Sequence, residues 1–326
     1  MRSWLNIAVL IALCGTTPSL AEPKTDTSPH KIQFITVHKD VRLEVLDWGG
    51  EGPPLIFLAG LTDTAHAFDG FAPKFTDKHH VYGITRRGFG ASSAPLPTAE
   101  NYDADRLGDD VLAVIAALKL DKPVLVGHSI AGEELSSIGT RQPEKVAGLV
   151  YLDAAYSYAF YNADGYTTPV DMANIRRAMD FLQSPTGTRS ERRAAVEELK
   201  FALPRFQRDL NRFAERLEIP EQVEWSPIDR AIANNPRKYT DIKVPVLAIF
   251  ASPQKCAPNC DTPEAKTRAA TTLSQVNNFE AHTPSAKVVR IPYADHNIVR
   301  SHEADVTREM NAFMDGLEKS QKEKAN

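Results

Sequence analysis

The sequence predicts an α/β fold with one mostly parallel sheet, helices on both faces of the sheet, and a helical segment inserted after the sixth strand. Short apolar runs alternate with amphipathic stretches along most of the chain. Strands that helical crossovers connect form parallel sheets, which helices then cover. The alternation stops between Asp153 and Asp241, where no strand pattern occurs. This break indicates an insertion into the sheet domain.

The expected strands are short apolar runs rich in Val, Ile, Leu and Phe. The first two, at 32–37 and 41–48, are joined by a tight turn, so we expect them to pair antiparallel at one edge. The strands that follow in chain order are expected at 54–58, 80–85, 124–126, 146–152, 244–250 and 287–291.

Helices are expected where apolar residues recur every three or four positions. Leu107, Val111, Val114, Ile115 and Leu118 share one face of such a helix. A second helix should follow the run at 124–126 and continue to about 141, and a last helix should cover 303–317. The charged residues 318–326 are expected to form a flexible tail.

The inserted segment is expected to be a helical cap of residues 154–240 on a core made of 22–153 and 241–317. Residues 172–182 and 191–217 are rich in Arg, Glu, Ala and Leu, which favour helices. Pro185, Pro204 and Pro220 should punctuate these helices. The cap begins with an aromatic cluster that could line a substrate pocket or form the core of the cap: Tyr156, Tyr158, Phe160, Tyr161 and Tyr166.

The first 21 residues have the pattern of a secretory signal peptide. Arg2 precedes a short apolar core at 5–13, and Ala21 allows cleavage before Glu22. A spanning helix needs roughly 20 apolar residues, so this core is too short to be one. Cys14 raises the alternative of a lipoprotein, although Leu13 is large where a lipidation site has a small residue. We therefore expect a periplasmic or secreted protein with no stable membrane span after cleavage.

Export changes the interpretation of the two cysteines that remain after cleavage. Cys256 and Cys260 flank a turn-like Ala-Pro-Asn triplet. In an oxidising compartment such a pair is expected to form a small disulfide. Two free thiols are the alternative, and a zinc site is disfavoured because two ligands do not complete a tetrahedral shell.

Composition excludes some functions. The net charge is −4, whereas a nucleic-acid partner would call for a basic face. No phosphate-binding loop follows a strand and no metal-ligand constellation is evident in the sequence. We expect no cofactor, no metal and no nucleic-acid partner, and the sequence does not indicate an oligomeric state.

The segment Gly127-His128-Ser129-Ile130-Ala131-Gly132 has the pattern of a nucleophile elbow. In that motif, G-x-S-x-G, a buried strand turns sharply into a helix and exposes one serine at the tip. Small residues two before and two after the serine let the turn close. Ala131 occupies the last position here and Gly132 follows it. The alternative is an ordinary turn between a strand and a helix.

Together with three other segments, the elbow resembles the α/β-hydrolase family. The resemblance covers about 32–317, and the segments occur in the family's order. Ala59-Gly60-Leu61 is similar to the oxyanion loop, although Ala59 stands where a histidine is usual. The second segment, Arg86-Arg87-Gly88-Phe89-Gly90-Ala91-Ser92, is similar to the family's x-R-G-x-G-x-S stretch. The third, Ile291-Pro292-Tyr293-Ala294-Asp295-His296, is similar to the loop that carries the catalytic histidine.

The resemblance implies a catalytic role for several residues. Ser129 would be the nucleophile and His296 its base. Backbone N–H groups of Leu61 and Ile130 would stabilise the oxyanion. The triad acid stays open: Asp153 follows the sixth strand and is favoured, whereas Asp261 is the first carboxylate after the seventh. The side chain of His128 is expected to point away from the nucleophile in a structural role.

A serine at position 129 narrows the reactions that the resemblance allows. Dehalogenases and epoxide hydrolases of this fold resemble one another in using an aspartate nucleophile. The chain is therefore expected to be an exported serine hydrolase that cleaves a small or medium carboxylic ester through an acyl-serine intermediate. Lactone, amide and carbon–carbon bond hydrolysis stay open on the same residues. The alternative from another functional class is a protein of the same fold that binds a ligand and has a degraded triad.

Overall fold

The fold is built on one sheet, whose order is β1-β2-β4-β3-β5-β6-β7-β8. The computed structural model describes residues 29–154, 169–217, 225–235, 237, 239, 241–256 and 260–325. The expected signal peptide and the aromatic cluster at 156–166 lie outside these residues. The strands are β1 (Lys31–His38), β2 (Val41–Gly49), β3 (Pro54–Leu58), β4 (His80–Ile84), β5 (Val124–His128), β6 (Gly148–Leu152), β7 (Val246–Ala251) and β8 (Ala286–Ile291).

The sheet is antiparallel at one edge and parallel elsewhere. β2 pairs antiparallel with both β1 and β4. The remaining pairs, β4-β3, β3-β5, β5-β6, β6-β7 and β7-β8, are parallel. The predicted fold class and the antiparallel opening pair are therefore confirmed. Because parallel strands end at the same edge, residues that follow β3, β5, β6 and β8 are brought together there.

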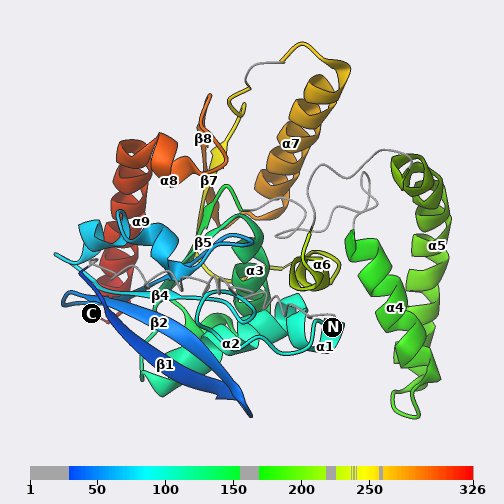
Figure 1. Cartoon of the computed structure of the whole chain (residues 1–326), viewed down its shortest axis with the longest axis horizontal. Coiled ribbons are helices and arrows are strands. Elements are labelled where there is room, and N and C mark those ends of the chain that lie inside the picture. Colours follow the sequence, from blue (N-terminus) through cyan, green and yellow to red (C-terminus); the bar gives the residue numbers. More distant parts are fainter. Residues whose placement is uncertain are drawn as a thin grey trace, which may run out of the picture.

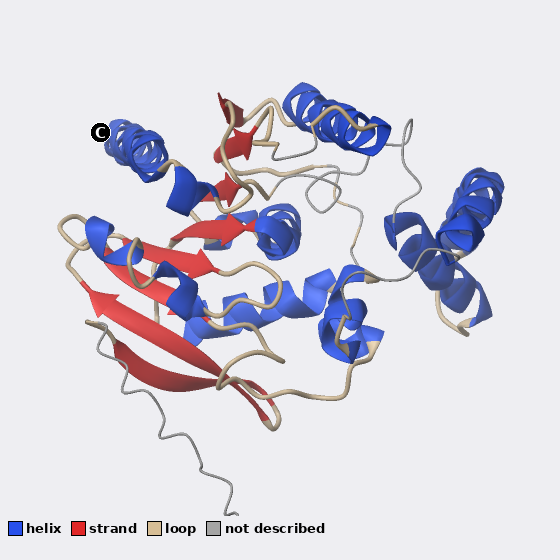
Figure 2. Cartoon of the chain, turned by 45° about the horizontal axis from the view of Figure 1, so that its top comes forward, coloured by secondary structure: helices blue, strands red, loops and turns tan. Residues whose placement is uncertain are grey.

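Helices cover both faces of the sheet (Figure 2). One face packs against α2 (Ala104–Ala117), α3 (Gly132–Arg141) and α7 (Pro263–His282). The other packs against η1 (Ala65–Phe68), η2 (Ala72–Phe75), α8 (Ile298–Ser301) and α9 (Glu303–Ala325). Short elements at the connections are α1 (Ala99–Tyr102), η3 (Ser129–Ala131) and η4 (Pro143–Lys145).

The two layers explain why the central strands have long apolar runs. Side chains of a strand alternate between the two faces. In β5, Leu125 packs into the layer with α2 and α3, while Val124 and Val126 pack into the layer with α8 and α9. A strand covered on both faces must therefore be apolar throughout. This is the pattern that allowed the strand to be found in the sequence.

The described part of the insertion after β6 is helical. It contains α4 (Pro169–Gln183), α5 (Arg189–Leu217) and α6 (Pro227–Ala233). Figure 1 shows α4 and α5 as a pair set apart from the sheet, while α6 lies near α3 and α1. Pro204 lies inside α5, so its expected role as a boundary is wrong. Strong helix formers on both sides of Pro204 offset the roughly 3 kcal/mol that an interior proline costs.

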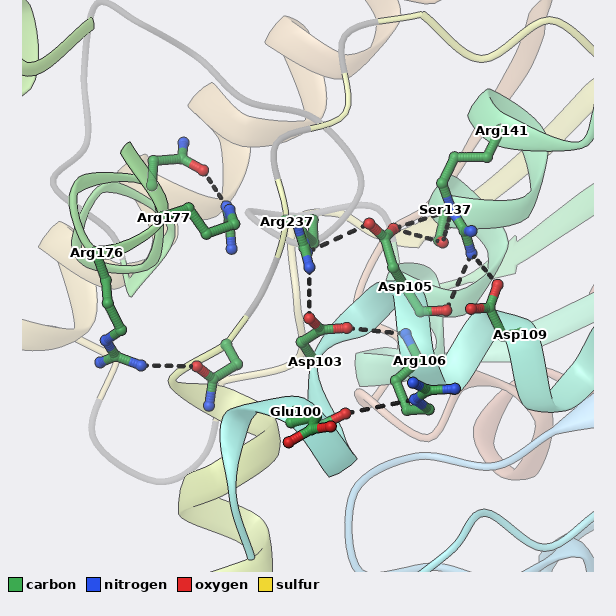
Figure 3. Close-up of polar contacts among 12 residues, drawn as sticks. Glu100, Asp103, Asp105, Arg106, Asp109, Ser137, Arg141, Arg176, Arg177 and Arg237 are labelled. Carbon is green, nitrogen blue, oxygen red and sulfur yellow. Dashed lines mark hydrogen bonds and ion pairs between the residues drawn. The ribbon is translucent and has the colours of Figure 1, made fainter. Parts of the chain in front are cut away.

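A network of Arg and Asp side chains joins the residues after α6 to the start of α2 (Figure 3). Arg237 Nη2 lies 2.5 Å from Asp103 Oδ2 and its Nε lies 3.3 Å from Asp105 Oδ2. Arg176 of α4 donates to Asn235 Oδ1 at 3.0 Å. Burial, and next the Arg237 cation, lower the pKa of Arg177 to about 10. Polar contacts therefore contribute to holding the insertion against α2.

Two further features differ from the sequence prediction. α7 and α6 were not predicted, although Thr262 caps α7 by accepting from Ala265 N at 3.1 Å and Ser226 forms a capping box with Asp229 at α6. α9 continues to Ala325, so residues 318–325, expected as a flexible tail, extend the helix that was predicted to end at 317. Those residues are mostly Lys, Glu, Gln and Ala, which propagate a helix that has already formed.

In the described parts of the chain, no helix has the length and apolar character that crossing a membrane requires.

Candidate active site

Ser129 occupies a sharp turn between β5 and α3. Its backbone φ is +55°, in the left-handed region that a serine rarely adopts. His128 before it is extended, and the η3 turn leads directly into α3. This conformation presents the hydroxyl at the carboxyl edge of the sheet. The backbone has the form that a nucleophile elbow requires.

The small residues around Ser129 are required by close packing. A Cβ on Gly127 would lie 2.9 Å from Leu135 Cδ1 and 3.1 Å from Ala131 Cβ. A Cβ on Gly132 would overlap the carbonyl oxygen of Ala154. Ala131 itself is fully buried and fits. The chain therefore tolerates alanine at the last position of the G-x-S-x-G pattern and needs glycine one residue later.

His296 joins Ser129 to Asp153. Its Nε2 lies 2.8 Å from Ser129 Oγ, and its Nδ1 lies 2.7 Å from Asp153 Oδ2. The histidine follows β8 and its imidazole is about half exposed, whereas the Asp153 carboxylate is fully buried. An imidazole held in this way carries a hydrogen on Nδ1 and presents a lone pair to the serine hydroxyl.

The Asp153 carboxylate is held by the last residue of β7 and by the turn that follows it. Ala251 N donates to Oδ1 at 2.9 Å, and Gln254 Nε2 donates to Oδ2 at 3.0 Å. The backbone of Asp153 has φ +48° at the end of β6. These donors fix the carboxylate and compensate for its burial.

Asp261, the alternative candidate for the triad acid, does not contact His296 in the structure. Its side chain is fully exposed, and its contact is with Lys266 Nζ at 3.5 Å. The structure thus brings Asp153 and not Asp261 to His296. No carboxylate follows β7 directly, and Gln254 supplies a hydrogen bond to Asp153 from that position.

The loop after β3 lies against the nucleophile. A Cβ placed on Gly60 would be 3.5 Å from Ser129 Cβ and 2.9 Å from His128 Nδ1, so a larger residue at position 60 would collide with the elbow. Leu61 follows and packs near Ile130. Ile130 lies in the first turn of η3, where N–H groups have no partner within the helix. Gly60 thus lies against the elbow that carries Ser129, and the side chain of the next residue, Leu61, packs with the cluster that contains Ile130.

Arg86 supports this loop, a role that the sequence analysis did not predict. Its Nη2 donates to Ala59 O at 2.9 Å and its Nη1 donates to Gly60 O at 3.3 Å. Its Nε donates to Glu134 Oε1 of α3 at 2.5 Å, and both side chains are buried. The two carbonyls are thereby fixed, and with them the peptide planes that carry the loop's N–H groups. Arg86 stands at the variable first position of the x-R-G-x-G-x-S stretch, so the motif neither marks this arginine nor reveals its partners.

A family model decides the classification. The model described as the alpha/beta hydrolase fold matches residues 53–300, which is most of the 326-residue chain.

The chain belongs to the α/β hydrolase fold family.

Individual relatives resemble this α/β hydrolase only in part of their length. It is 27% identical over 104 residues to a 2-(acetamidomethylene)succinate hydrolase of Mesorhizobium japonicum, which covers 32% of this chain and 36% of the relative. It is 29% identical over 115 residues to a fluoroacetate dehalogenase of a Burkholderia species, with coverage of 35% and 38%. The chain thus matches less than two fifths of each relative's length.

Solved structures support the fold over nearly the whole chain. The crystal structure of E-2-(acetamidomethylene)succinate hydrolase superposes with a TM-score of 0.53 and 18% identity, covering 88% of this chain and 99% of the other. At that identity the likeness shows the shared fold alone. Reaction and substrate must come from this hydrolase's own side chains.

His128 of this α/β hydrolase lies beneath the candidate base. Its Nε2 lies 2.9 Å from the carbonyl oxygen of His296, and the two rings are 4.9 Å apart. Burial, and next the nearby His296, lower the pKa of His128. A neutral ring that meets a carbonyl must carry its hydrogen on Nε2. His128 thus donates to the backbone of His296 and holds the loop that presents it.

We predict that loss of this donor lowers turnover without removing it. A neutral hydrogen bond contributes roughly 0.5–1.5 kcal/mol, so His128→Leu should reduce kcat by up to about tenfold. His128→Gln retains an N–H at similar reach and should recover part of the loss. Steady-state kinetics of both variants test this, with the exposed His38→Ala as control. Equal kcat in the leucine variant and the wild type would contradict the assigned role.

Glu133, in the first turn of α3, is fully buried. Within the described residues, neither of its carboxyl oxygens has a hydrogen-bond partner. Burial, and next the neighbouring Glu134, raise the pKa of Glu133 well above its ordinary value. The folded state therefore retains a proton that the unfolded chain releases near its ordinary pKa. By linkage, Glu133 makes the fold less stable as pH rises above that point.

We expect Glu133→Gln to be more stable than the wild type at alkaline pH. The difference should be on the order of 1–3 kcal/mol at pH 8, because each unit by which the folded pKa exceeds the unfolded pKa costs about 1.4 kcal/mol, and it should shrink toward pH 5, where the wild-type carboxyl is neutral. Urea unfolding at pH 5, 6.5 and 8 measures it, with the exposed Glu198→Gln as control. Parallel stability curves for wild type and Glu133→Gln would show that the assignment is wrong.

Proposed function

We propose that this protein is a serine hydrolase that cleaves a small or medium carboxylic ester through an acyl-serine intermediate. The observation that carries the proposal is the contact of His296 with both Ser129 and Asp153, at 2.8 and 2.7 Å. A serine hydroxyl becomes an effective nucleophile when a neighbouring base removes its proton. The same contact serves carbon–carbon bond hydrolysis, and it serves lactone and amide hydrolysis, which the experiment below separates from ester hydrolysis.

The reaction follows from the hydrogen bonds of these residues. Ser129 Oγ attacks the ester carbonyl while His296 Nε2 takes the hydroxyl proton. Asp153 accepts from Nδ1–H and stabilises the imidazolium that forms. The backbone N–H groups of Leu61 and Ile130 stabilise the oxyanion. His296 then returns the proton to the leaving alcohol, and a water activated by the same base releases the acid from Ser129.

An apolar wall built around Ile130, the residue after Ser129, supports a hydrophobic substrate group. Ile130 packs with Tyr102, Leu107 and the α6 residues Ala231 and Ile232. Leu61, Phe89 and Ile228 are partly buried against this cluster. Apolar side chains that remain partly exposed next to a nucleophile favour an acyl or alkyl group over a charged one. The insertion thus contributes to the wall through α6.

The names of the relatives include a dehalogenase and an epoxide hydrolase among similar structures. A covalent route for either reaction would form an ester between substrate carbon and an enzyme carboxylate. Position 129 provides a hydroxyl instead. Acyl transfer is therefore the reaction that the residues of this chain support.

Labelling with a serine-directed fluorophosphonate tests the proposal. We expect labelling of the wild type at Ser129 and none in Ser129→Ala. A panel of p-nitrophenyl esters of increasing acyl length, with matched anilides and lactones, should then give the highest kcat/KM for an ester. Turnover of anilides or lactones alone would replace the ester assignment, and absence of labelling would overturn the hydrolase proposal in favour of a binding protein.

We further propose that the chain is exported after removal of residues 1–21 and that Cys256 and Cys260 are bonded. The pattern of Arg2, the apolar core and Ala21 supports cleavage. The Cα atoms of Cys256 and Cys260 lie 5.3 Å apart, a separation that a disulfide requires. Both residues are exposed, and they are four positions apart in the sequence.

Intact-mass measurement of protein secreted from its full-length precursor is expected to give a chain that begins at Glu22 and resists thiol alkylation until it is reduced. Reduction should lower the free energy of unfolding by about 2 kcal/mol, because the loop closed by the bond is short. Retention of Arg2 in the purified chain would rule out cleavage, and two alkylated cysteines without reduction would rule out the bond.

A further inference from the structure

Two histidines and an aspartate converge on the side of the sheet that carries η1. His30 Nδ1 lies 3.0 Å from Asp69 Oδ1, and His66 Nδ1 lies 3.2 Å from Asp69 Oδ2. Each of the three residues offers a ligand atom within 4.8 Å of the other two. His30 precedes β1, His66 lies in η1 and Asp69 ends that turn. The fold thus gathers three donors from two separate segments.

We propose that His30, His66 and Asp69 bind a divalent transition-metal cation, with zinc as the expected occupant and water as the fourth ligand. Two imidazole nitrogens and one carboxylate oxygen form a donor set that zinc accepts. Zinc bonds of about 2.0–2.1 Å in a tetrahedron place neighbouring donors about 3.3 Å apart. His30 Nδ1 lies 3.0 Å from one oxygen of Asp69 and His66 Nδ1 lies 3.2 Å from the other, so each imidazole is close to that separation from one carboxylate oxygen.

The side chains that contact Asp69 and His66 resemble those that support the ligands of a metal site. Trp48 Nε1 donates to Asp69 Oδ1 at 3.1 Å. The second nitrogen of His66, Nε2, faces Glu44 Oε1 at 3.5 Å, and Glu44 is held by Thr85 Oγ1 at 2.7 Å. A carboxylate behind a ligating histidine orients its ring and increases its basicity.

Charge and exposure also suit a cation. Asp69 and Glu44 are carboxylates, so the two negative charges would balance a divalent ion bound by neutral histidines. The side chain of His30 is 2% exposed, whereas those of His66 and Asp69 are 32% and 20% exposed. An ion can therefore reach the site from the His66 side and would be enclosed at His30. Binding would connect the segment before β1 to η1.

Calorimetric titration of the metal-free protein with zinc chloride tests the proposal. The protein is treated with a chelator after removal of any affinity tag. We expect one zinc ion per chain and an increase in melting temperature on binding. His66→Ala and Asp69→Asn should each weaken binding by at least about tenfold, and Glu44→Gln by about 10- to 100-fold. The exposed His38→Ala is the matched control and should bind zinc as the wild type does.

Two further measurements separate loss of ligands from loss of fold. Asp69→Asn retains a side-chain oxygen for Trp48, so its circular dichroism and metal-free melting temperature should remain near those of the wild type. Cobalt(II) in place of zinc should give the visible bands of a tetrahedral site, and His66→Ala should remove them. Undiminished affinity in both His66→Ala and Asp69→Asn would overturn the proposal. Absence of zinc binding to the wild type would also overturn it and leave the three residues as a hydrogen-bonded network.

Discussion

Ser129→Ala is expected to lower ester turnover by about 10⁶-fold, as removal of the nucleophile does in serine hydrolases whose triad acts as a unit. The hydroxyl interacts with His296 and contributes little to packing. Alanine retains the Cβ and the backbone conformation, so the fold should persist. The measurement is kcat on the best ester of the panel, together with thermal unfolding of both proteins.

The exposed Ser274→Ala on α7 is the matched control and should retain full turnover. His296→Ala should approach the effect of Ser129→Ala, because the base and nucleophile act together. If Ser129→Ala kept more than a small fraction of the wild-type rate, another residue would have to be the nucleophile.

Asp153→Asn should reduce kcat by about 10⁴-fold, by analogy with the protease triad. An amide at this position can donate to His296 Nδ1 and would favour the tautomer with hydrogen on Nε2, which cannot accept the serine proton. The amide oxygen can still accept from Ala251 N, so the contact with the end of β7 should remain, whereas the hydrogen bond from Gln254 Nε2 is lost. Steady-state kinetics and near-UV circular dichroism of the variant separate a tautomer effect from a folding effect.

Asp261→Asn supplies the comparison on the same substrate. Because Asp261 is fully exposed and contacts Lys266, its amide variant should lose little activity. A severe loss in Asp261→Asn with a mild loss in Asp153→Asn would reverse the assignment of the acid. Equal losses of activity in both variants would contradict the assignment of Asp153 as the residue that orients His296.

The sequence predicts those parts of the site that local patterns and strand order determine. Ser129 could be found because a turn of this kind demands small neighbours at fixed spacing. His296 and Asp153 each follow a strand, and parallel strands bring such positions to one edge of the sheet. The structure places the three side chains in contact there, while their catalytic roles stay predictions until the variants are measured.

Contacts between distant side chains could not be predicted in the same way. The Arg86–Glu134 pair joins residues 48 apart, and nothing in either segment marks the other. The histidines at 30 and 66 are also unremarkable in the sequence, where we expected no metal site. Pro204 and the residues after Glu318 show another limit, because helix propensities of their neighbours outweighed the usual meaning of a proline or a charged terminus.

The position of β8 has a consequence for when the protein can become active. β8 is an edge strand whose partner in the sheet is β7, and His296 comes five residues after it ends. Ser129 and Asp153 are both synthesised in the first half of the chain, so a nascent chain carries its nucleophile and acid long before its base. Until the last strand pairs with β7, the Ser129 hydroxyl has no imidazole to accept its proton. Hydrolysis should therefore begin only at the end of folding, and its onset could be used to time the closing of the sheet.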